Sequence, residues 1–400
     1  MSDTAAPPLF MRRDGFAPDS ELGRLRDEEG VRKTPTIFGR EVWLVTRHAD
    51  VRQVLSDHER FSIQQVPPVA TAPPMSEEQA AYLRAGNLLA LDPPDHTRLR
   101  RMLAGEFTGR RIRRLEPRVR EIVDDHLDAL ERGGSPADLV ASFALPVPSL
   151  VICELLGVPY EDRADFQERS RLILDLSEPI ERRRAANIDA RGYITELVDR
   201  KRAAPDDSLL GMLVREHGDD LTDAELSGIG MLLLMAGHET TSNMLGLGTL
   251  ALLRHPDQLK LMRDRPETVE GAVDAAVEEL LRWLSVVHAG TFKVTTTEVT
   301  IGGQTIGPGE LVVCSLPAAN RDPAFMPDPE TLDLTRDAAG HVAFGHGVHH
   351  CLGAPLARME LRIAFPALLR RFPGLRLAGP EPDYREFNIV YGVESLLVAW

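Results

Sequence analysis

The sequence is poor in several features that define whole classes of protein. It has only three cysteines, Cys153, Cys314 and Cys351, in 400 residues. This odd and widely spaced set argues against a disulfide framework and favours a reducing, cytoplasmic setting. No apolar run reaches the roughly eighteen residues of a membrane-spanning helix. Residues 1–10 lack the basic and apolar regions of a signal peptide, so a soluble cytoplasmic protein is expected.

Positive charge is also scarce, because 46 Lys and Arg residues face 61 Asp and Glu residues and leave a net charge of -15. Such a balance opposes binding to nucleic acid or to an anionic membrane. The charge is uneven, however, since residues 98–120 contain nine arginines and two glutamates. This basic run predicts either a solvated helical face or a docking surface for an acidic protein.

The chain has the composition of a globular protein, with 43% apolar and 27% charged residues, and no linker or repeat divides it. Helical periodicity dominates, as in residues 112–130, 190–202 and 268–284. Residues 37–46 and 291–318 are rich in Val, Ile and Thr, with glycine turns, and predict antiparallel β structure. These patterns indicate an α-rich α+β protein with a small β part.

One helix is expected to be much longer than the rest. Thr222 and Glu225 form a Thr-x-x-Glu capping box, and the apolar pattern then continues without proline to His255. At 1.5 Å per residue, about 33 residues extend roughly 50 Å, so this helix must cross the core. Its middle carries the run Ala-Gly-His-Glu-Thr-Thr, residues 236–241, where Gly237 and the hydroxyl groups favour a local opening.

A second motif surrounds the last cysteine. Phe344, Gly347, Cys351 and Gly353 follow the spacing Phe-x-x-Gly-x-x-x-Cys-x-Gly, just before an apolar helix expected over residues 356–369. Glycines permit a tight loop with positive φ, and a helix N-terminus stabilises a thiolate. A buried structural cysteine and a zinc cluster with neighbouring histidines are the alternatives.

This spacing resembles the haem-binding loop of the cytochrome P450 family. The resemblance covers residues 18–400 and implies a single triangular domain of the cytochrome P450 fold, preceded by a flexible segment at residues 1–17. It implies that Cys351 is the axial ligand of the iron of heme b, whose thiolate favours O–O cleavage. The other cofactor contacts that it implies are His96, Arg100, Ala236, Gly237, Thr240, Lys293, Phe344, Gly345, His349 and Gly353.

The resemblance also gives roles to two polar pairs. Glu239 and Thr240 match the acid-alcohol pair that delivers protons during dioxygen activation. Glu279 and Arg282 match a structural Glu-x-x-Arg pair that holds the cysteine loop. Where the family often adds an arginine to this pair, the chain has Thr331, which leaves Arg321 and His341 as candidates for that place.

The resulting prediction is a monooxygenase that inserts one atom of O₂ into a C–H or C=C bond of a lipophilic metabolite, such as a macrolide, polyketide or terpenoid. Electrons would come from NAD(P)H through ferredoxin reductase and a [2Fe-2S] or related ferredoxin that docks on residues 98–120. Two alternatives remain: a peroxide-driven or redox-neutral haem-thiolate enzyme, and a noncatalytic haem sensor or binding protein. Glu239 and Thr240 favour the monooxygenase, because peroxide users need no such proton relay.

Overall fold

The computed structural model describes residues 6–36, 40–67, 75–264 and 272–400 of the chain. These residues form two compact units. The first, called the sheet unit, comprises the described residues within 1–72, 247–351 and 383–394, and the second, called the helical unit, comprises those within 73–246, 352–382 and 395–400. The single domain predicted over residues 18–400 remains a prediction.

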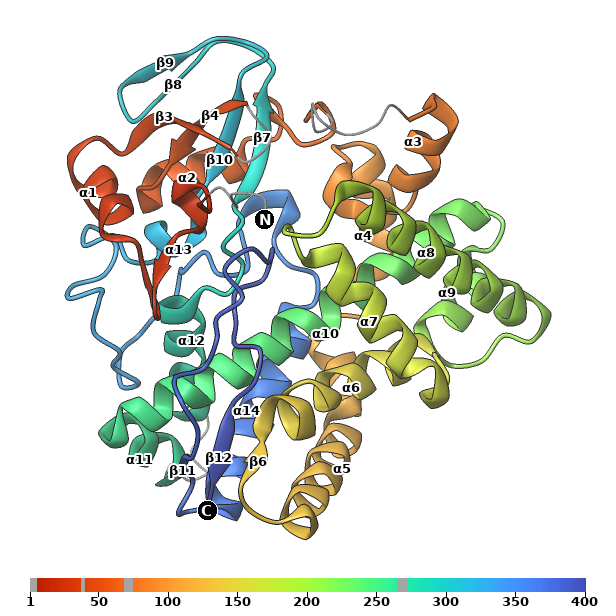
Figure 1. Ribbon diagram of the computed structural model, residues 1–400. Coiled ribbons are helices and arrows are strands. Elements are labelled where there is room, and N and C mark those ends of the chain that lie inside the picture. The colour runs from red at the N-terminus through yellow and green to blue at the C-terminus, as the bar shows by residue number, and fades with distance from the viewer. Residues whose placement is uncertain (1–5, 37–39, 68–74, 265–271) are drawn as a thin grey trace. The chain divides into compact units, whose positions relative to one another are not determined.

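A mixed five-stranded sheet is the centre of the sheet unit, with strand order β3-β4-β10-β7-β5; Figure 1 labels the first four of these strands. Its pairings are antiparallel except for the parallel pair of β4 and β10. Apolar side chains of the sheet and of α2 form one core with the β8–β9 hairpin. The elements of this unit are η1 (Leu9–Met11), β1 (Arg13–Asp14), β2 (Ala17–Pro18), α1 (Ser20–Glu28), β3 (Val31–Pro35), β4 (Glu41–Val45), α2 (His48–Ser56), β5 (Phe61–Ser62), α11 (Pro256–Asp264), α12 (Ala272–Leu284), β7 (Thr291–Thr295), β8 (Val299–Ile301), β9 (Gln304–Ile306), β10 (Leu311–Cys314), α13 (Leu316–Ala319) and η5 (Gly347–His349).

Helices make up most of the helical unit, where α14 packs along α5, and α8 packs against α7 and α9 (Figure 1). A small antiparallel sheet of order β11-β12-β6 completes it. The elements are α3 (Glu77–Arg84), η2 (Leu88–Ala90), α4 (Asp95–Ala104), α5 (Gly109–Gly133), β6 (Ala137–Asp138), the π-helical turn η3 (Val140–Ala144), α6 (Pro146–Leu156), η4 (Tyr160–Asp162), α7 (Arg163–Leu174), α8 (Ile180–Ala203), α9 (Leu209–His217), α14 (Ala354–Arg371), β11 (Arg376–Leu377) and β12 (Leu397–Ala399). The long helix α10 (Asp223–Arg254) begins in this unit and ends in the sheet unit.

The long helix forms where the capping box predicts it. Thr222 Oγ1 accepts a hydrogen bond from the Glu225 backbone N–H at 3.1 Å, and Glu225 Oε2 accepts one from the Thr222 N–H at 2.9 Å. These bonds satisfy two donors that a helix start otherwise leaves without partners. The helix then runs for 32 residues and is continuous through residues 236–241. The predicted local opening at Gly237 is therefore wrong.

The other predicted elements also form, with two differences. The strands predicted to be antiparallel include one parallel pair, β4 with β10, and the start of the chain differs as well. Strands occur within residues 37–46 and 291–318, and helices within residues 112–130, 190–202 and 272–284. Leu9, Phe10 and Met11, in the segment expected to be flexible, are buried, and the Phe10 ring meets the Phe292 ring edge-on at 5.8 Å. Residues 268–271 lie outside the described residues. Within those residues no helix has both the length and the apolar character needed to cross a membrane.

Candidate functional site

The cysteine motif forms a loop in the sheet unit that is closed by backbone hydrogen bonds. The Cys351 N–H donates to the Phe344 carbonyl at 2.9 Å, and inside this closure the His350 N–H donates to the Gly347 carbonyl at 3.0 Å. The Gly345 N–H bonds the Val342 carbonyl at 2.8 Å. Because these hydrogen bonds pair backbone N–H and carbonyl groups within the loop, the loop can hold the Cys351 side chain at its surface.

Glycine is required at two loop positions. Gly345 has a φ of 72° and Gly347 a φ of 71°, both in the left-handed region that other residues avoid. A Cβ on Gly347 would also overlap the Leu55 carbonyl oxygen and lie 2.8 Å from the Ser56 Cα, so the loop rests directly on the end of α2. Gly353 differs from the prediction, because its φ is -80° and it serves as the N-cap of α14.

The three cysteines differ sharply in their surroundings. Burial raises the pKa of the Cys153 thiol and that of the Cys314 thiol to about 12, so both remain protonated at neutral pH. Cys351 is exposed and lies three residues before the start of α14. Of the three thiols, Cys351 is therefore the one whose surroundings favour a thiolate accessible to a metal ion.

Four of the predicted cofactor contacts carry basic side chains, which the resemblance assigns to the haem propionates, and they are distributed over both units. In the helical unit His96 is 2% exposed, and Arg100 is half-buried one turn later on α4. In the sheet unit Lys293 is 1% exposed on β7, and His349 is half-buried in η5. Lys293 in the sheet unit, and His96 with Arg100 on α4 in the helical unit, each offer N–H donors of the kind that bind an anionic group, so the chemistry of the residues in each unit fits an anionic cofactor.

The predicted oxygen-binding residues occupy different faces of α10. Thr240 is partly exposed and its Oγ1 donates to the Ala236 carbonyl at 2.8 Å. Glu239 is 3% exposed; its backbone carbonyl accepts from Asn243 Nδ2 at 2.7 Å, and its carboxylate lies 3.4 Å from His238 Nε2. The acid and the alcohol are thus neighbours in sequence, but the acid is in a buried polar cluster and the alcohol is accessible.

Gly237 has a packing role that the sequence motif did not reveal. A Cβ at this position would lie 2.7 Å from the Ile152 Cδ1, so α6 approaches α10 at this point. A larger residue here would separate the two helices. The glycine therefore fixes the helix-helix distance beside Ala236 and Thr240 without opening the helix itself.

Glu279 and Arg282 form the predicted buried pair. Both side chains have 0% exposure, and Arg282 Nε and Nη2 donate to the two Glu279 oxygens at 2.6 and 2.8 Å. Arg282 Nη1 also donates to the Asn320 carbonyl at 2.8 Å, and Asn320 Oδ1 accepts from the Val342 N–H at 2.7 Å. Asn320 thus links the pair to the start of the cysteine loop, a connection that the sequence spacing did not show.

Neither candidate for the third member of this pair takes that place. Arg321 pairs with Glu330, and His341 Nε2 lies 3.2 Å from a Glu278 oxygen. The position is filled by Arg336, which the sequence analysis missed because it lies five residues beyond Thr331 and outside the expected spacing.

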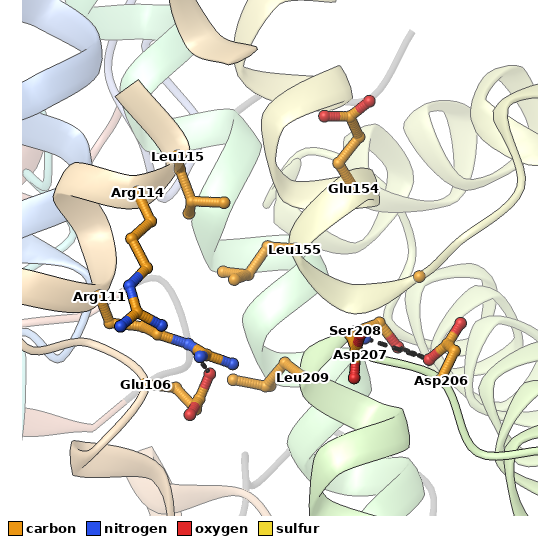
Figure 2. A pocket seen from close by; sticks show the side chains of 11 residues that line it. Glu106, Arg111, Arg114, Leu115, Glu154, Leu155, Asp206, Asp207, Ser208 and Leu209 are labelled. Atoms are coloured by element: carbon orange, nitrogen blue, oxygen red, sulfur yellow. Dashed lines mark hydrogen bonds and ion pairs between the residues drawn. The ribbon is translucent and has the colours of Figure 1, made fainter. Parts of the chain in front are cut away.

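Two other arrangements are separate from these residues. Within the described residues no three or more His, Cys, Asp or Glu side chains are grouped to hold a metal ion, which disfavours the zinc cluster. A surface pocket of about 370 Å³ lies in the helical unit among α5, α6 and the start of α9 (Figure 2). Charged and apolar side chains line it; they include Arg111 and Arg114 of the basic run, and none of the residues predicted to bind haem or activate oxygen is among them.

The chain is similar to known proteins along most or all of its length. The family model for cytochrome P450 matches residues 148–387. Cytochrome P450 FAS1 of Rhodococcoides fascians is 49% identical over 404 residues and 100% of both chains. Vitamin D(3) 25-hydroxylase of Pseudonocardia autotrophica is 44% identical over 394 residues, 95% of this chain and 93% of that protein. The crystal structure of CYP105P1 in complex with filipin I has a TM-score of 0.90 and 40% identity, with 99% of each chain covered.

Full-length identity of this size shows the fold and the reaction class together. The chain belongs to the cytochrome P450 family: it is a haem-thiolate monooxygenase that takes electrons from NAD(P)H through ferredoxin reductase and ferredoxin.

Proposed function

We propose that Cys351 is the residue that binds the haem iron. The observation that supports this proposal is that Cys351 is the one exposed thiol among the three cysteines. It lies in a loop in which Gly345 and Gly347 have the left-handed conformation. The other two thiols are buried with raised pKa values and cannot supply a thiolate at neutral pH. Phe344, whose carbonyl closes the loop, and Gly345 would lie beside the macrocycle.

Four basic side chains, two buried and two half-buried, would hold the propionates. His96 and Arg100 lie one turn apart on α4, so both can point at a single anion. Lys293 and His349 supply further donors from the sheet unit. Lysine provides a point charge where an arginine would make two parallel hydrogen bonds, so the Lys293 contact depends on charge more than on geometry.

Thr240 would orient water and dioxygen on the accessible face of α10, and Glu239 would replenish the proton from the buried side. The Thr240 hydroxyl already donates to the Ala236 carbonyl, which leaves its lone pairs available to accept from a water molecule. Bound haem supplies the oxidising chemistry. The protein residues position the substrate, control water and move protons.

The substrate would be an uncharged, lipophilic metabolite that is hydroxylated at a C–H bond or oxidised at a C=C bond. Two similar proteins support this class, because one is named as a vitamin D(3) hydroxylase and the other was crystallised with filipin I. A macrolide, polyketide or terpenoid fits the same chemistry. Recognition would then depend mainly on shape and apolar contact, as in most small-molecule sites.

The ferredoxin would dock on a defined part of the basic run. Four of its nine arginines are internally paired: Arg98 with Glu225, Arg111 with Glu106, Arg118 with Glu154, and Arg120 with Glu116. Arg101, Arg110, Arg113 and Arg114 are exposed and form no ion pair with any residue that the structure describes. These four carry the charge that an acidic partner can still use.

A carbon monoxide difference spectrum of the reduced protein tests the cysteine assignment. The Cys351→Ser variant should lose the red-shifted band of a thiolate ligand, whereas the matched Cys153→Ala variant should keep it. Wild-type protein that contains no haem, or a Cys351→Ser protein with an unchanged band, would refute the proposal. Product formation with hydrogen peroxide but not with ferredoxin and NADPH would instead support the peroxide-driven alternative.

A further inference from the structure

His238 is a fully buried titratable group in the middle of α10. Its side chain is 0% exposed, and its Nδ1 lies 2.7 Å from the Leu234 carbonyl oxygen one turn earlier. A carbonyl oxygen can only accept a hydrogen bond, so Nδ1 carries a proton and donates it. The charge of the imidazole is therefore decided at Nε2, which bears either a lone pair or a second proton.

The second ring nitrogen of His238 faces the acid that follows it in sequence. Nε2 is buried and makes no hydrogen bond within the described residues, and the Glu239 Oε1 atom lies 3.4 Å from it. Consecutive side chains of a helix diverge by about 100° and do not normally face each other. The approach of these two groups is therefore not a simple consequence of their being neighbours in the chain.

A second helix holds the His238 ring in this orientation. Phe166 of α7 is buried and meets the imidazole edge-on, with ring centroids 5.3 Å apart and an interplanar angle of 82°. The hydrogen bond to Leu234 fixes one nitrogen of the imidazole, and the Phe166 ring restricts its rotation. Nε2 therefore keeps its direction towards Glu239.

The Glu239 carboxyl group lies between two long contacts, one at each oxygen. Oε1 is 3.4 Å from His238 Nε2, and Oε2 is 3.4 Å from Asn243 Nδ2. Both distances exceed the usual hydrogen-bond range of about 2.7–3.2 Å. The last torsion of a glutamate side chain has broad minima, so a small rotation brings Oε1 within bonding distance of Nε2.

This geometry requires a proton between the two groups. A lone pair on Nε2 that faces an ionised carboxylate would place two acceptors against each other in a buried site, and neither would have a donor there. One proton removes the conflict, whether the oxygen or the nitrogen carries it. In both cases the pair of His238 and Glu239 has no net charge, which is the least costly state for buried groups.

We propose that His238 and Glu239 hold one shared proton on α10, and that His238 thereby keeps Glu239 ready to donate. His238 is a positioning residue: it acts through Glu239 and does not touch the reacting atoms. When Glu239 gives up the proton, its O–H bond breaks, the electron pair stays on oxygen, and the carboxylate again faces Nε2. That unfavourable contact favours uptake of the next proton from solvent. The inference rests on the proposed function, because it takes Glu239 to supply protons to Thr240.

His126 makes the same backbone contact as His238 without the acid. Its Nδ1 lies 2.8 Å from the Ile122 carbonyl oxygen one turn earlier in α5. Of these two histidines, only His238 has a carboxylate oxygen at ion-pair distance within the part of the chain that the structure describes. His126 is therefore the matched control for a substitution at His238.

NMR of the reduced holoenzyme with bound carbon monoxide, a diamagnetic form, tests the shared proton directly. Histidine labelled with nitrogen-15 and glutamate labelled with carbon-13 report the protonation of Nε2 and of the carboxyl group, and Glu239→Gln and His238→Asn assign the signals. At pH 7 the wild type should show either a protonated Nε2 or a protonated Glu239 carboxyl group. An unprotonated Nε2 together with an ionised Glu239 would overturn the proposal. This test needs only the wild type and Glu239→Gln if His238→Asn fails to fold.

Turnover with ferredoxin and NADPH tests what the pair does. In His238→Asn the amide can keep the bond to the Leu234 carbonyl but leaves nothing at the Nε2 position, whereas in His238→Gln the amide reaches that position. His238→Asn should slow turnover about tenfold, as expected for the loss of roughly one hydrogen bond to Glu239, and His238→Gln should recover part of the loss. Added to Glu239→Gln, the asparagine should have no further effect. His126→Asn should leave turnover unchanged.

Turnover driven by hydrogen peroxide separates proton supply from a general effect on the site, because peroxide brings its own protons. The rate of His238→Asn with peroxide should match that of the wild type. Equal losses with peroxide and with NADPH would show that His238 only shapes the site, and would overturn the proposal. If Glu239→Gln keeps full activity with ferredoxin and NADPH, the proposed function of Glu239 fails, and the NMR signals still decide whether the pair holds a shared proton.

Discussion

Arg336 Nε lies 3.8 Å from the Glu279 oxygen that Arg282 Nη2 also binds, so two guanidinium groups share one fully buried carboxylate. Arg336 is mostly buried and also donates to the Pro327 carbonyl at 2.7 Å. The second arginine thus fixes the segment before the cysteine loop onto the carboxylate that α12 provides. It does so although the chain has Thr331 where an arginine was expected.

Replacement of either Glu279 or Arg282 should destabilise the protein strongly. Arg282→Gln leaves a buried carboxylate without its main partner, which costs about 3–5 kcal/mol, whereas Arg336→Gln should cost about 1 kcal/mol because the longer contact is secondary. Urea unfolding midpoints of the apoprotein would measure both effects. Arg24→Gln, an exposed arginine of α1, is the control. Equal losses for Arg282→Gln and Arg336→Gln would show that the two arginines are equivalent.

Thr240→Ala should uncouple NADPH consumption from product formation. The hydroxyl that orients water is lost, so reduced dioxygen would be released as hydrogen peroxide, while the rate of NADPH use stays nearly the same. Glu239→Gln should instead slow turnover about tenfold or more, because the buried proton source is lost. Peroxide and product assayed against NADPH consumed separate the two effects. An unchanged coupling ratio in Thr240→Ala would count against its role in proton delivery.

The sequence predicted what depends on short spacing and missed what depends on tertiary contact. The capping box at Thr222 and Glu225 predicted the start of α10, because both partners lie within one turn. The Arg336 and Asn320 contacts could not be predicted, since they join residues 57 and 38 positions from Glu279 and Arg282, respectively.

The glycines show the same difference between what short spacing predicts and what depends on tertiary contact. Left-handed conformation at Gly347 follows from the motif, but the close approach of Ile152 to Gly237 depends on where α6 packs. The sequence pattern suggested that Gly237 opens the helix, and packing gives it a different role.

His288 should make stability depend on pH in the acid range. Burial, followed by the nearby charge of Arg13, lowers the pKa of His288 to about 3, and its Nε2 hydrogen-bonds the Asn388 carbonyl at 2.7 Å. As the pH falls below about 6.5, His288 binds a proton in the unfolded chain but stays neutral in the folded chain. Stability is therefore fully present above pH 6.5 and is lost as the pH falls towards 3, by at most about 5 kcal/mol at 1.36 kcal/mol per pH unit.

The matching variant is His288→Gln, whose amide can keep the hydrogen bond but cannot ionise. Unfolding midpoints measured from pH 7 to pH 4 should fall less steeply in this variant than in the wild type. His58→Gln, a half-buried histidine of the same unit, should leave the slope unchanged. Parallel pH profiles for wild type and His288→Gln would contradict the assignment.

Glu360 should produce the opposite dependence. It is 1% exposed in α14, its Oε2 has no hydrogen-bond partner within the described residues, and burial raises its pKa well above the usual value. The folded chain thus keeps a proton that the unfolded chain releases above about pH 4.5. Stability from this group is present at low pH and is lost as the pH rises through the folded pKa.

Glu360→Gln removes that ionisation and keeps the size of the side chain. The variant should be more stable than wild type at pH 8, because at that pH the folded wild type must either keep a proton that the unfolded chain releases or bury a charge, and glutamine does neither. At pH 5 the two proteins should be nearly equal, because the wild-type carboxyl is then neutral in the folded state. Glu196→Gln, an exposed glutamate of α8, serves as the control. A variant less stable than wild type at pH 8 would mean that the carboxylate is charged and solvated, and that water reaches Glu360.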